Sequence, residues 1–506
     1  GKMGVLTHNT KFVRLFVNDK YSGVFHWTTR EDESLLIHKK RVSGPFFIGD
    51  TLGHRWKAEQ FQVAGNEEVL KRFNPLEKML SALYKPIGHE RYRELWSILS
   101  KEKYAAWVAV NNLVSSIHSD FAHNQLFYFD PSRGRIEPIV SDMLGHGTQL
   151  FPLYKYRIWQ DFVPFPRVTL NERMQPLMSV VLSDPTFYDL RNRLLYRALT
   201  SFGSRQQQIA DLTEIYEKID ADVNADQYKT ALQNTFIGGY PIPYSNAQFH
   251  NMKEVLFDWI GKRETFLLSE LEKSRVSIHA EQESSAGDVT VLIEVSGHSA
   301  VDFDPERING KVYADRDLDG SNRHAISQRI RLYPGLREYI GTDWDLWTYG
   351  DKRHLVPSHQ RYLFKVQQTS LKQLGKDLGE AFRNATTKSQ VAPTIKVSSS
   401  IDTKNYVVSE ASLHAWRLHR EPETPVELGP GIIDLLADLN IGREQTLTIM
   451  PGTRVRLAKD VSIFSRGKVL INGTSKQPVV FERLHQDDAW GGLAIQGKGA
   501  SGSTIK

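Results

Sequence analysis

The sequence HSDFAHNQLFY occupies residues 118–128, and the turn-forming stretch DPSRG and a short strand then lead to SDMLG at residues 141–145. A carboxylate, Asp120, thus lies four residues before a carboxamide, Asn124. A second carboxylate, Asp142, follows the strand that returns from the turn. The order predicts a helix end, a polar loop, a hairpin and a carboxylate where the hairpin ends.

Phosphoryl transfer needs these residue types. One Asp accepts the proton of the acceptor hydroxyl, while an Asn and another Asp hold a divalent metal ion against the nucleotide phosphates. Oxygen ligands of this kind suit Mg²⁺. The spacing by itself favours a structural interpretation, in which Asp120 caps a turn, Asn124 satisfies loop backbone and Asp142 ends a strand, because short polar motifs recur by chance.

The region around this stretch, residues 1–275, is expected to be an α+β domain. Val13, Leu15 and Val17 alternate before the turn at residues 18–20, and Val24 and Phe25 begin a return strand, which predicts a hairpin. A final helix is predicted because apolar residues and one arginine recur at three- and four-residue spacing. These residues are Leu256, Trp259, Ile260, Arg263, Leu267 and Leu271.

The pattern D-x-x-H-N-x-x-x-Y, followed by a hairpin and a strand that ends in Asp, resembles the catalytic segment of the CotH family. These are spore-coat kinases with an atypical protein-kinase fold. The sequence VRLFVNDKYSGVF at residues 13–25 is similar to the family's first hairpin. The sequence VLFDWIGKRETFLLSELE at residues 255–272 is similar to its closing helix, which has a central Arg. The resemblance spans most of residues 10–275.

The resemblance implies an ATP-dependent kinase. It implies that Asp120 is the catalytic base and that Asn124 and Asp142 hold the Mg²⁺ or Mn²⁺ that accompanies ATP. It also implies that His123 shapes the catalytic loop, and a neutral imidazole that faces the core is the alternative for this residue.

Three positions depart from the family pattern. Thr29, Ile48 and Leu144 stand where the family has a Glu, a phosphate-contacting Lys and a second metal-binding Asp. The charged residues that could take over these roles are Glu31, Lys39, Lys40 and Lys57. Loss of such charges weakens transition-state stabilisation, so a weak, degenerate or inactive kinase is an alternative.

The middle region, residues 276–425, is predicted to be an all-β sandwich, with an immunoglobulin-like arrangement as one candidate. Apolar residues occupy every second position from Val289 to Val295, as in a half-buried strand. Asp315, Asp317 and Asp319 have the spacing of a calcium loop.

An EF-hand is excluded because Ile326 occupies the twelfth position of this loop, where an EF-hand has Glu. A calcium-binding turn between strands and a solvated acidic turn are the remaining interpretations of Asp315, Asp317 and Asp319.

The third region, residues 426–506, contains short apolar strands separated by Gly and Pro at a near-constant interval. Stacked coils of a parallel β-solenoid have this pattern. The order of TLTIMPGTRVRLA, GKVLINGT, PVVF and WGGLAI resembles the opening coils of right-handed parallel β-helix proteins. We therefore expect an incomplete β-helix here.

The bulk composition limits the class of protein. A chain of 506 residues is expected to form about three domains. The net charge of +5 has both signs interspersed, which argues against a nucleic-acid partner. The absence of cysteine excludes disulfides and thiol chemistry. No apolar run is long enough for a membrane span. No signal peptide is visible, and both ends look truncated.

The leading prediction is a secreted or cell-surface, bacterial-type multidomain protein that phosphorylates Ser or Thr on an exported or surface-assembled partner. The alternative is a non-catalytic adhesin or matrix protein in which a kinase-like domain and the β domains provide binding. A third hypothesis is a carbohydrate-active β-helix enzyme, which needs paired carboxylates on adjacent coils.

Overall fold

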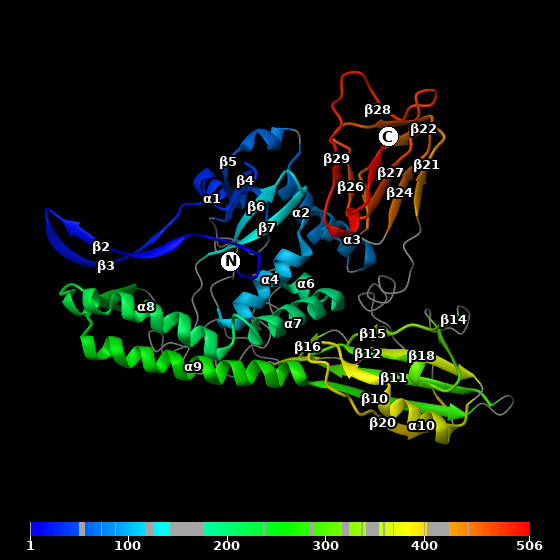
Figure 1. Ribbon diagram of the computed structural model, residues 1–506, viewed down its shortest axis with the longest axis horizontal. Coiled ribbons are helices and arrows are strands. Elements are labelled where there is room, and N and C mark those ends of the chain that lie inside the picture. The colour runs from blue at the N-terminus through cyan, green and yellow to red at the C-terminus, as the bar shows by residue number, and fades with distance from the viewer. Residues whose placement is uncertain are drawn as a thin grey trace.

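The computed structural model describes residues 2–49, 56–71, 73–86, 88–116, 125–141, 176–235, 238–282, 287–315, 323–334, 337–340, 354–357, 360–367, 369–398, 400–401, 425–442 and 445–506. Within them, the apolar side chains gather into separate cores. The large core of the first region ends at Leu271, that of the middle region runs from Val276 to Val391, and that of the third region begins at Leu428. Figure 1 shows the three regions in blue to green, green to yellow, and orange to red.

A mixed sheet with the strand order β1-β7-β6-β4-β5 forms the centre of the first region. Its strands are β1 (Leu6–Thr7), β4 (Pro45–Gly49), β5 (Phe61–Gly65), β6 (Leu126–Asp130) and β7 (Arg135–Val140). β1 runs parallel to β7, and the other neighbours are antiparallel. Successive side chains of a strand point to opposite faces. Phe47 and Phe127 accordingly lie in the large core, and Phe46 and Tyr128 in a smaller core on the other face.

Helices cover both faces of this sheet. α1 (Glu33–His38) covers the smaller core through Leu35 and Leu36. The helices that contribute to the large core include α2 (Pro75–Leu83), α3 (His89–Ile98), α4 (Lys101–Leu113), α6 (Pro176–Leu182) and α7 (Pro185–Leu199). Asp184 caps α7 by accepting a hydrogen bond from the Thr186 amide, and Pro185 occupies the first helical position.

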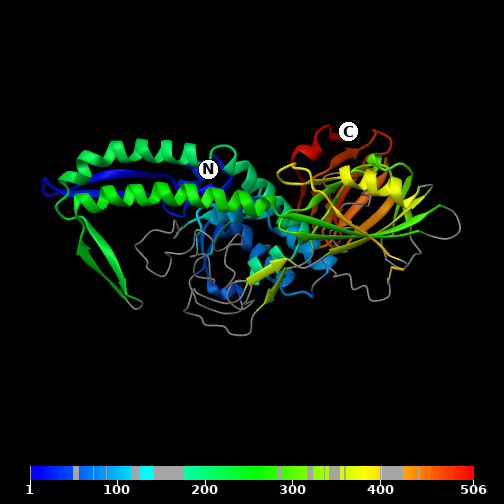
Figure 2. The ribbon, with the colours of Figure 1, turned by 90° about the horizontal axis from the view of Figure 1, so that it is seen from below.

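Two long helices, α8 (Arg205–Ala225) and α9 (Asn246–Glu272), run side by side in opposite directions (Figures 1 and 2). Between them the hairpin of β8 (Thr230–Thr235) and β9 (Gly238–Pro243) projects away from the helix pair (Figure 2). No helix within the described ranges combines the length and apolar character needed to cross a bilayer.

The predicted first hairpin is confirmed. β2 (Thr10–Val17) pairs antiparallel with β3 (Lys20–Thr28), and both turn residues, Asn18 and Asp19, have the positive φ that tight hairpin turns require. The ribbon lies along α8, where Arg14 Nε is 2.8 Å from a carboxylate oxygen of Asp222 (Figure 2).

The middle region consists mainly of two sheets that share one core. The larger sheet has the order β14-β13-β18-β11-β10-β20, and the smaller has the order β15-β12-β19. The elements are β10 (Ser274–Gln282), β11 (Val289–Gly297), β12 (Val301–Phe303), β13 (Lys311–Asp315), β14 (Arg323–Ile326), β15 (Ile330–Leu332), β16 (Arg337–Ile340), β17 (His354–Pro357), β18 (Gln360–Gln367), α10 (Leu371–Glu380), β19 (Phe382–Asn384) and β20 (Thr394–Val397). The predicted alternation from Val289 to Val295 is confirmed, because every second side chain there is buried in the shared core.

In the third region, successive strands pass through three parallel sheets in turn, with the orders β21-β24-β27-β30, β22-β25-β28 and β23-β26-β29. The strands are β21 (Val426–Leu428), β22 (Gly431–Leu435), β23 (Leu439–Ile441), β24 (Thr446–Ile449), β25 (Thr453–Leu457), β26 (Ile463–Ser465), β27 (Lys468–Ile471), β28 (Val480–Arg483), β29 (Leu493–Ile495) and β30 (Thr504–Ile505). Leu447, Val455 and Ile463, one from each sheet, are fully buried in one core.

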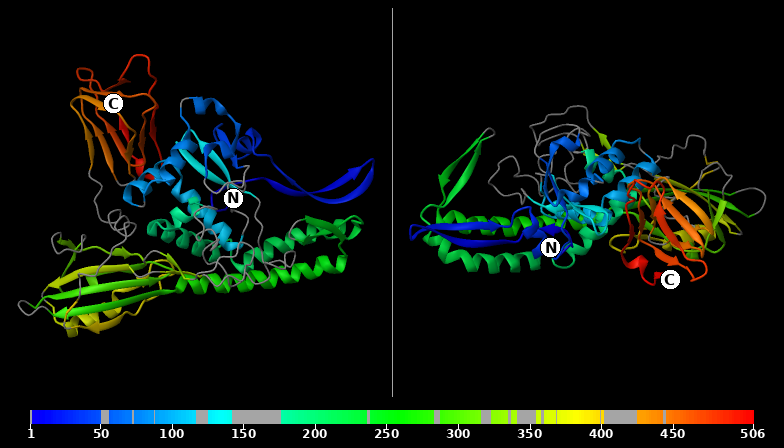
Figure 3. Two further views of the ribbon diagram at one scale, coloured as in Figure 1. Left: turned by 180° about the vertical axis from the view of Figure 1, so that it is seen from behind. Right: turned by 90° about the horizontal axis from the view of Figure 1, so that it is seen from above.

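This third region lies against the first (Figure 3). Arg466 donates a hydrogen bond of 2.9 Å to the Trp96 carbonyl at α3, and Lys78 of α2 forms an ion pair with Asp438.

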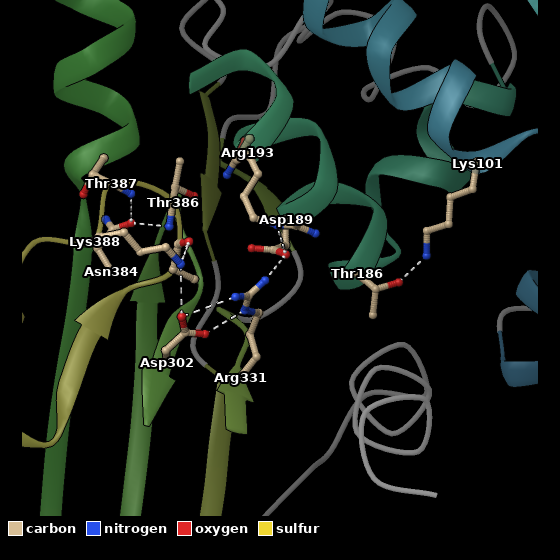
Figure 4. Close-up of polar contacts among 12 residues, drawn as sticks. Lys101, Thr186, Asp189, Arg193, Asp302, Arg331, Asn384, Thr386, Thr387 and Lys388 are labelled. Carbon is tan, nitrogen blue, oxygen red and sulfur yellow. Dashed lines mark hydrogen bonds and ion pairs between the residues drawn. The ribbon is translucent and has the colours of Figure 1, made fainter. Parts of the chain in front are cut away.

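A buried ionic network joins the middle region to the first (Figure 4). Arg331 of β15 places Nη1 2.9 Å from Asp189 Oδ2 of α7 and Nε 2.8 Å from Asp302 Oδ1 of β12. Arg193 also pairs with Asp189, and Lys388 with Asp302. The side chains of Asp189 and Asp302 are only 3% and 11% exposed, so these charges depend on each other for compensation.

A largely buried histidine at the same interface makes stability dependent on pH. The Nε2 atom of His298 lies 3.0 Å from Glu270 Oε2, and its side chain is 13% exposed. Burial lowers the pKa of His298 below its ordinary value, helped by the nearby Arg191 and Lys273 charges, although Glu270 opposes the shift. The folded protein therefore holds this imidazole neutral more strongly than the unfolded chain does.

We expect the stabilising contribution of His298 to be fully present above a pH of about 6.5, the pKa of an unfolded histidine, and to be lost as the pH drops towards the lowered folded pKa of His298. The measurement is the melting temperature of the wild type and His298→Gln between about pH 7.5 and 5. The melting temperature of the wild type should fall more over this pH range than that of the variant. Equal losses in both proteins would refute the assignment.

Candidate functional site

Several strand ends meet at one end of the first-region sheet. β1 and β7 end together there, since Thr7 pairs with Val140. β4 ends beside the start of β6, where the Gly49 amide donates a hydrogen bond of 2.9 Å to the Gln125 carbonyl. Because β6 and β7 are antiparallel, the start of β6 and the end of β7 lie at this same end.

The predicted catalytic residues lie outside the described residues. Asp120, His123 and Asn124 belong to residues 117–124, and Asp142 and Leu144 belong to residues 142–175.

The attachment points of these two segments are nevertheless defined. The chain leaves the first segment at Gln125, directly before β6, and enters the second after Ser141, directly after β7. Both points belong to the sheet end described above. The segment with Asp120 therefore ends, and the segment with Asp142 begins, at the same end of the sheet.

α4 leads the chain towards this edge. The amide of Ser100, before the helix, donates to the Ile136 carbonyl near the start of β7, whereas Trp107 Nε1 donates to the Ile139 carbonyl near its end. The helix and β7 thus run in the same direction, and α4 ends just before residues 117–124.

Two buried arginines hold the C-terminus of α4. Arg263 of α9 donates a hydrogen bond of 2.6 Å to the Asn112 carbonyl, and Arg191 of α7 donates one of 3.2 Å to the Asn112 side-chain oxygen. Both arginines are at most 1% exposed, and burial lowers the pKa of Arg191 to about 9. Cations stabilise the negative end of a helix dipole. Arg263 and Arg191 therefore fix the position from which the chain enters the segment that contains Asp120.

A polar cluster lies beyond the end of β1. The Nδ1 atom of His8 is 2.9 Å from the Thr29 carbonyl oxygen, and the Asn9 amide donates a hydrogen bond of 3.1 Å to the Thr29 hydroxyl. Lys39, which directly follows α1, donates a hydrogen bond of 2.7 Å to Asn9 Oδ1. Glu31 Oε1 lies 3.4 Å from His8 Nε2. This His8–Asn9–Thr29–Glu31–Lys39 group is called the β1 cluster below.

The sequence of the first region matches a known protein family. The family model for the CotH kinase protein matches residues 1–267, which is more than half of the chain. The chain belongs to the CotH kinase family. No curated protein matches the sequence. The matched range contains the central sheet, the helices around it and all but the last residues of α9.

In this CotH chain, two of the positions that were predicted from the sequence to depart from the family pattern lie within the described residues. Thr29 is 6% exposed and serves as a hydrogen-bond partner for His8 and Asn9. Ile48 lies on β4 and packs against the smaller core beside α1. Neither side chain supplies a charge.

The three lysines that could replace the predicted phosphate-contacting lysine differ in exposure and in contacts. Lys57 is 61% exposed in its side chain and lies 3.6 Å from Glu59. Lys40 is exposed and has a φ of 52°. Lys39 alone among these three is half-buried and joins the β1 cluster.

No sequence pattern pointed to the roles of His8, Asn9 and Arg191. His8 and Asn9 follow a strand of only two residues, which has no detectable periodicity. Arg191 lies among helix-forming residues in the sequence, and only its burial in the structure distinguishes it from other helical arginines. A run of polar residues directly after the apolar pair Val5–Leu6, as in VLTHN at residues 5–9, is the one local signal that was present.

No group of three or more His, Asp or Glu side chains within the described ranges is arranged to hold a metal ion. Asp315 is the last residue of β13, which pairs with β14, so the predicted calcium loop connects two neighbouring strands. Asp317 and Asp319 lie outside the described residues.

Proposed function

We propose that this CotH chain transfers the γ-phosphoryl group of ATP to a Ser or Thr hydroxyl of an exported or surface-assembled protein. The observation that carries the proposal is the common sheet edge at which the segments with Asp120 and Asp142 attach, in a chain of this kinase family. Catalytic groups from separate loops can converge there because a rigid sheet positions both.

The proposed roles follow from the donor set. Asp120 accepts the proton of the acceptor hydroxyl as its oxygen bonds to the γ-phosphorus and the bond to the ADP oxygen breaks. Asn124 and Asp142 offer oxygen ligands, which fit Mg²⁺ or Mn²⁺. The bound ion would neutralise charge on the phosphates. His123 is proposed to shape the loop between Asp120 and Asn124.

ATP binding tests this proposal. The melting temperature of the full chain should rise when ATP and Mn²⁺ or Mg²⁺ are added together, because a ligand at about 100 times its Kd stabilises a protein by about 2.7 kcal/mol. ATP with EDTA should give a smaller rise. An unchanged melting temperature at millimolar ATP and metal would reject the kinase.

A non-catalytic binding scaffold is the second candidate. The packing of Ile48 against the smaller core favours it, because an isoleucine side chain supplies no charge to bind phosphates. The scaffold predicts no rise in melting temperature with ATP and metal, and it would function as a secreted adhesin or matrix component.

We propose that the middle region is a β-sandwich and that the third is the opening of a right-handed parallel β-helix. The shared core of two sheets supports the first interpretation, and the three-sheet order of parallel strands supports the second. These regions would extend the kinase domain towards its surface partner. Asp315, Asp317 and Asp319 remain a proposed Ca²⁺ loop at one end of the sandwich.

A further inference from the structure

Lys39 carries a charge that lacks a carboxylate partner within the described part of the chain. Its ammonium group donates to Asn9 Oδ1 at 2.7 Å, and Asn9 is its only hydrogen-bond acceptor among those residues. The side chain is half-buried, so its hydration is reduced. A partly desolvated cation with a neutral partner favours the approach of an anion.

The position of this cation is set by the pairing of β1 with β7. Asn9 comes two residues after Thr7, and Thr7 pairs in parallel with Val140. The ammonium group of Lys39 therefore contacts the chain two residues beyond the sheet end at which β7 also ends. The segment that contains Asp142 begins one residue after Ser141, which directly follows β7.

Two hydrogen bonds anchor Asn9, the residue that supports Lys39. The Thr29 amide donates a hydrogen bond of 3.1 Å to the Asn9 carbonyl, and the Asn9 amide donates a hydrogen bond of 3.1 Å to the Thr29 hydroxyl. These reciprocal bonds join the chain after β1 to the chain after β3. The Asn9 carboxamide is thus fixed at its backbone, and it limits the positions that the Lys39 ammonium group can adopt. Such preorganisation reduces the cost of ordering a charge during ligand binding.

We propose that Lys39, positioned by Asn9, contacts the phosphate groups of ATP and replaces the lysine that Ile48 does not supply. This inference rests on the proposed phosphotransfer function. Lysine binds phosphate as a point charge. Lys39 comes from the helix α1 side of the sheet, the side on which Ile48 also packs.

The test is the affinity of the full chain for ATP and for adenosine, measured by calorimetry in Mn²⁺. Lys39→Met should weaken ATP binding by about 10–100-fold, the range expected for losing a hydrogen bond to a charged group. Adenosine, which lacks phosphates, should bind equally to both proteins. Lys40→Met, a substitution at the exposed neighbouring lysine, should leave the ATP affinity unchanged.

A second variant keeps Lys39 and changes only its partner. Asn9→Asp has the same shape and places a carboxylate against the ammonium group, so it should neutralise the cation and weaken ATP binding while the backbone hydrogen bonds to Thr29 remain.

The outcomes separate this inference from the function on which it rests. If the wild type binds ATP and both variants bind it equally well, the assignment of Lys39 is wrong and the kinase proposal stands. If the wild type does not bind ATP, both are wrong. Weaker ATP binding in Asn9→Asp supports the assignment even where Lys39→Met fails to fold.

Discussion

Replacing Asp120 with asparagine should slow phosphate transfer by about 10²–10⁴-fold, the usual contribution of a positioned general base. Asparagine cannot accept the hydroxyl proton, but it retains the size and polarity of the side chain. The affinity for ATP with metal should stay the same, because Asp120 is assigned to the acceptor and not to the nucleotide. The measurement is the initial rate of phosphate incorporation at saturating ATP, beside the Kd for ATP.

Two further variants, Asp142→Ala and Asp258→Asn, would be measured beside Asp120→Asn for transfer and for ATP binding. Asp142→Ala should lose both transfer and metal-dependent ATP binding, because it removes a proposed metal ligand. Asp258 lies on the exposed side of α9 in an ion pair with Lys262, so Asp258→Asn should behave as the wild type. Unchanged transfer by Asp120→Asn would remove the base from the proposed mechanism.

Replacing Arg331 with methionine should lower the free energy of unfolding by about 3–5 kcal/mol, because it leaves Asp189 and Asp302 buried without their shared cation. Burial alone would raise the pKa of Asp302, yet hydrogen bonds and charges from Arg331, with a contribution from Lys388, hold that pKa below its ordinary value. The network therefore stabilises the ionised carboxylate (Figure 4). The measurement is denaturant unfolding at neutral pH.

Arg329 provides a matched control two residues earlier. Its side chain is 60% exposed and pairs with Asp304 at 2.9 Å. Arg329→Met should cost about 0–1 kcal/mol, as exposed ion pairs do. Equal effects of the two substitutions would show that the network does not hold the middle region against α7.

Local patterns in the sequence were sufficient for the first hairpin and for the closing helix. Asn18 and Asp19 predict a tight turn by their own conformational preferences, and the three- and four-residue spacing around Arg263 predicts a helix face. The partner of Arg263, the carbonyl of Asn112, could not be predicted, because it depends on how α9 packs against α4.

The β1 cluster is a second arrangement that local sequence patterns could not predict. The sequence offers Lys39 as one of several candidate cations, and only the parallel pairing of Thr7 with Val140 brings the chain that leads to Asn9 to the end of β7. That contact joins residues more than a hundred positions apart, and no local propensity encodes it. Asp120, Asn124 and Asp142 remain predictions based on residue type and family resemblance.

Phosphate transfer from labelled ATP tests the central claim most directly. The full chain and its Asp142→Ala variant would be incubated with ATP and Mn²⁺ or Mg²⁺, alone and with an array of Ser- and Thr-containing peptides, and covalent phosphate would be measured by intact mass and label. A CotH kinase with the proposed site should give metal-dependent phosphate on the chain or on peptides with the wild type only. No covalent phosphate in any reaction, or equal phosphate with Asp142→Ala, would contradict it.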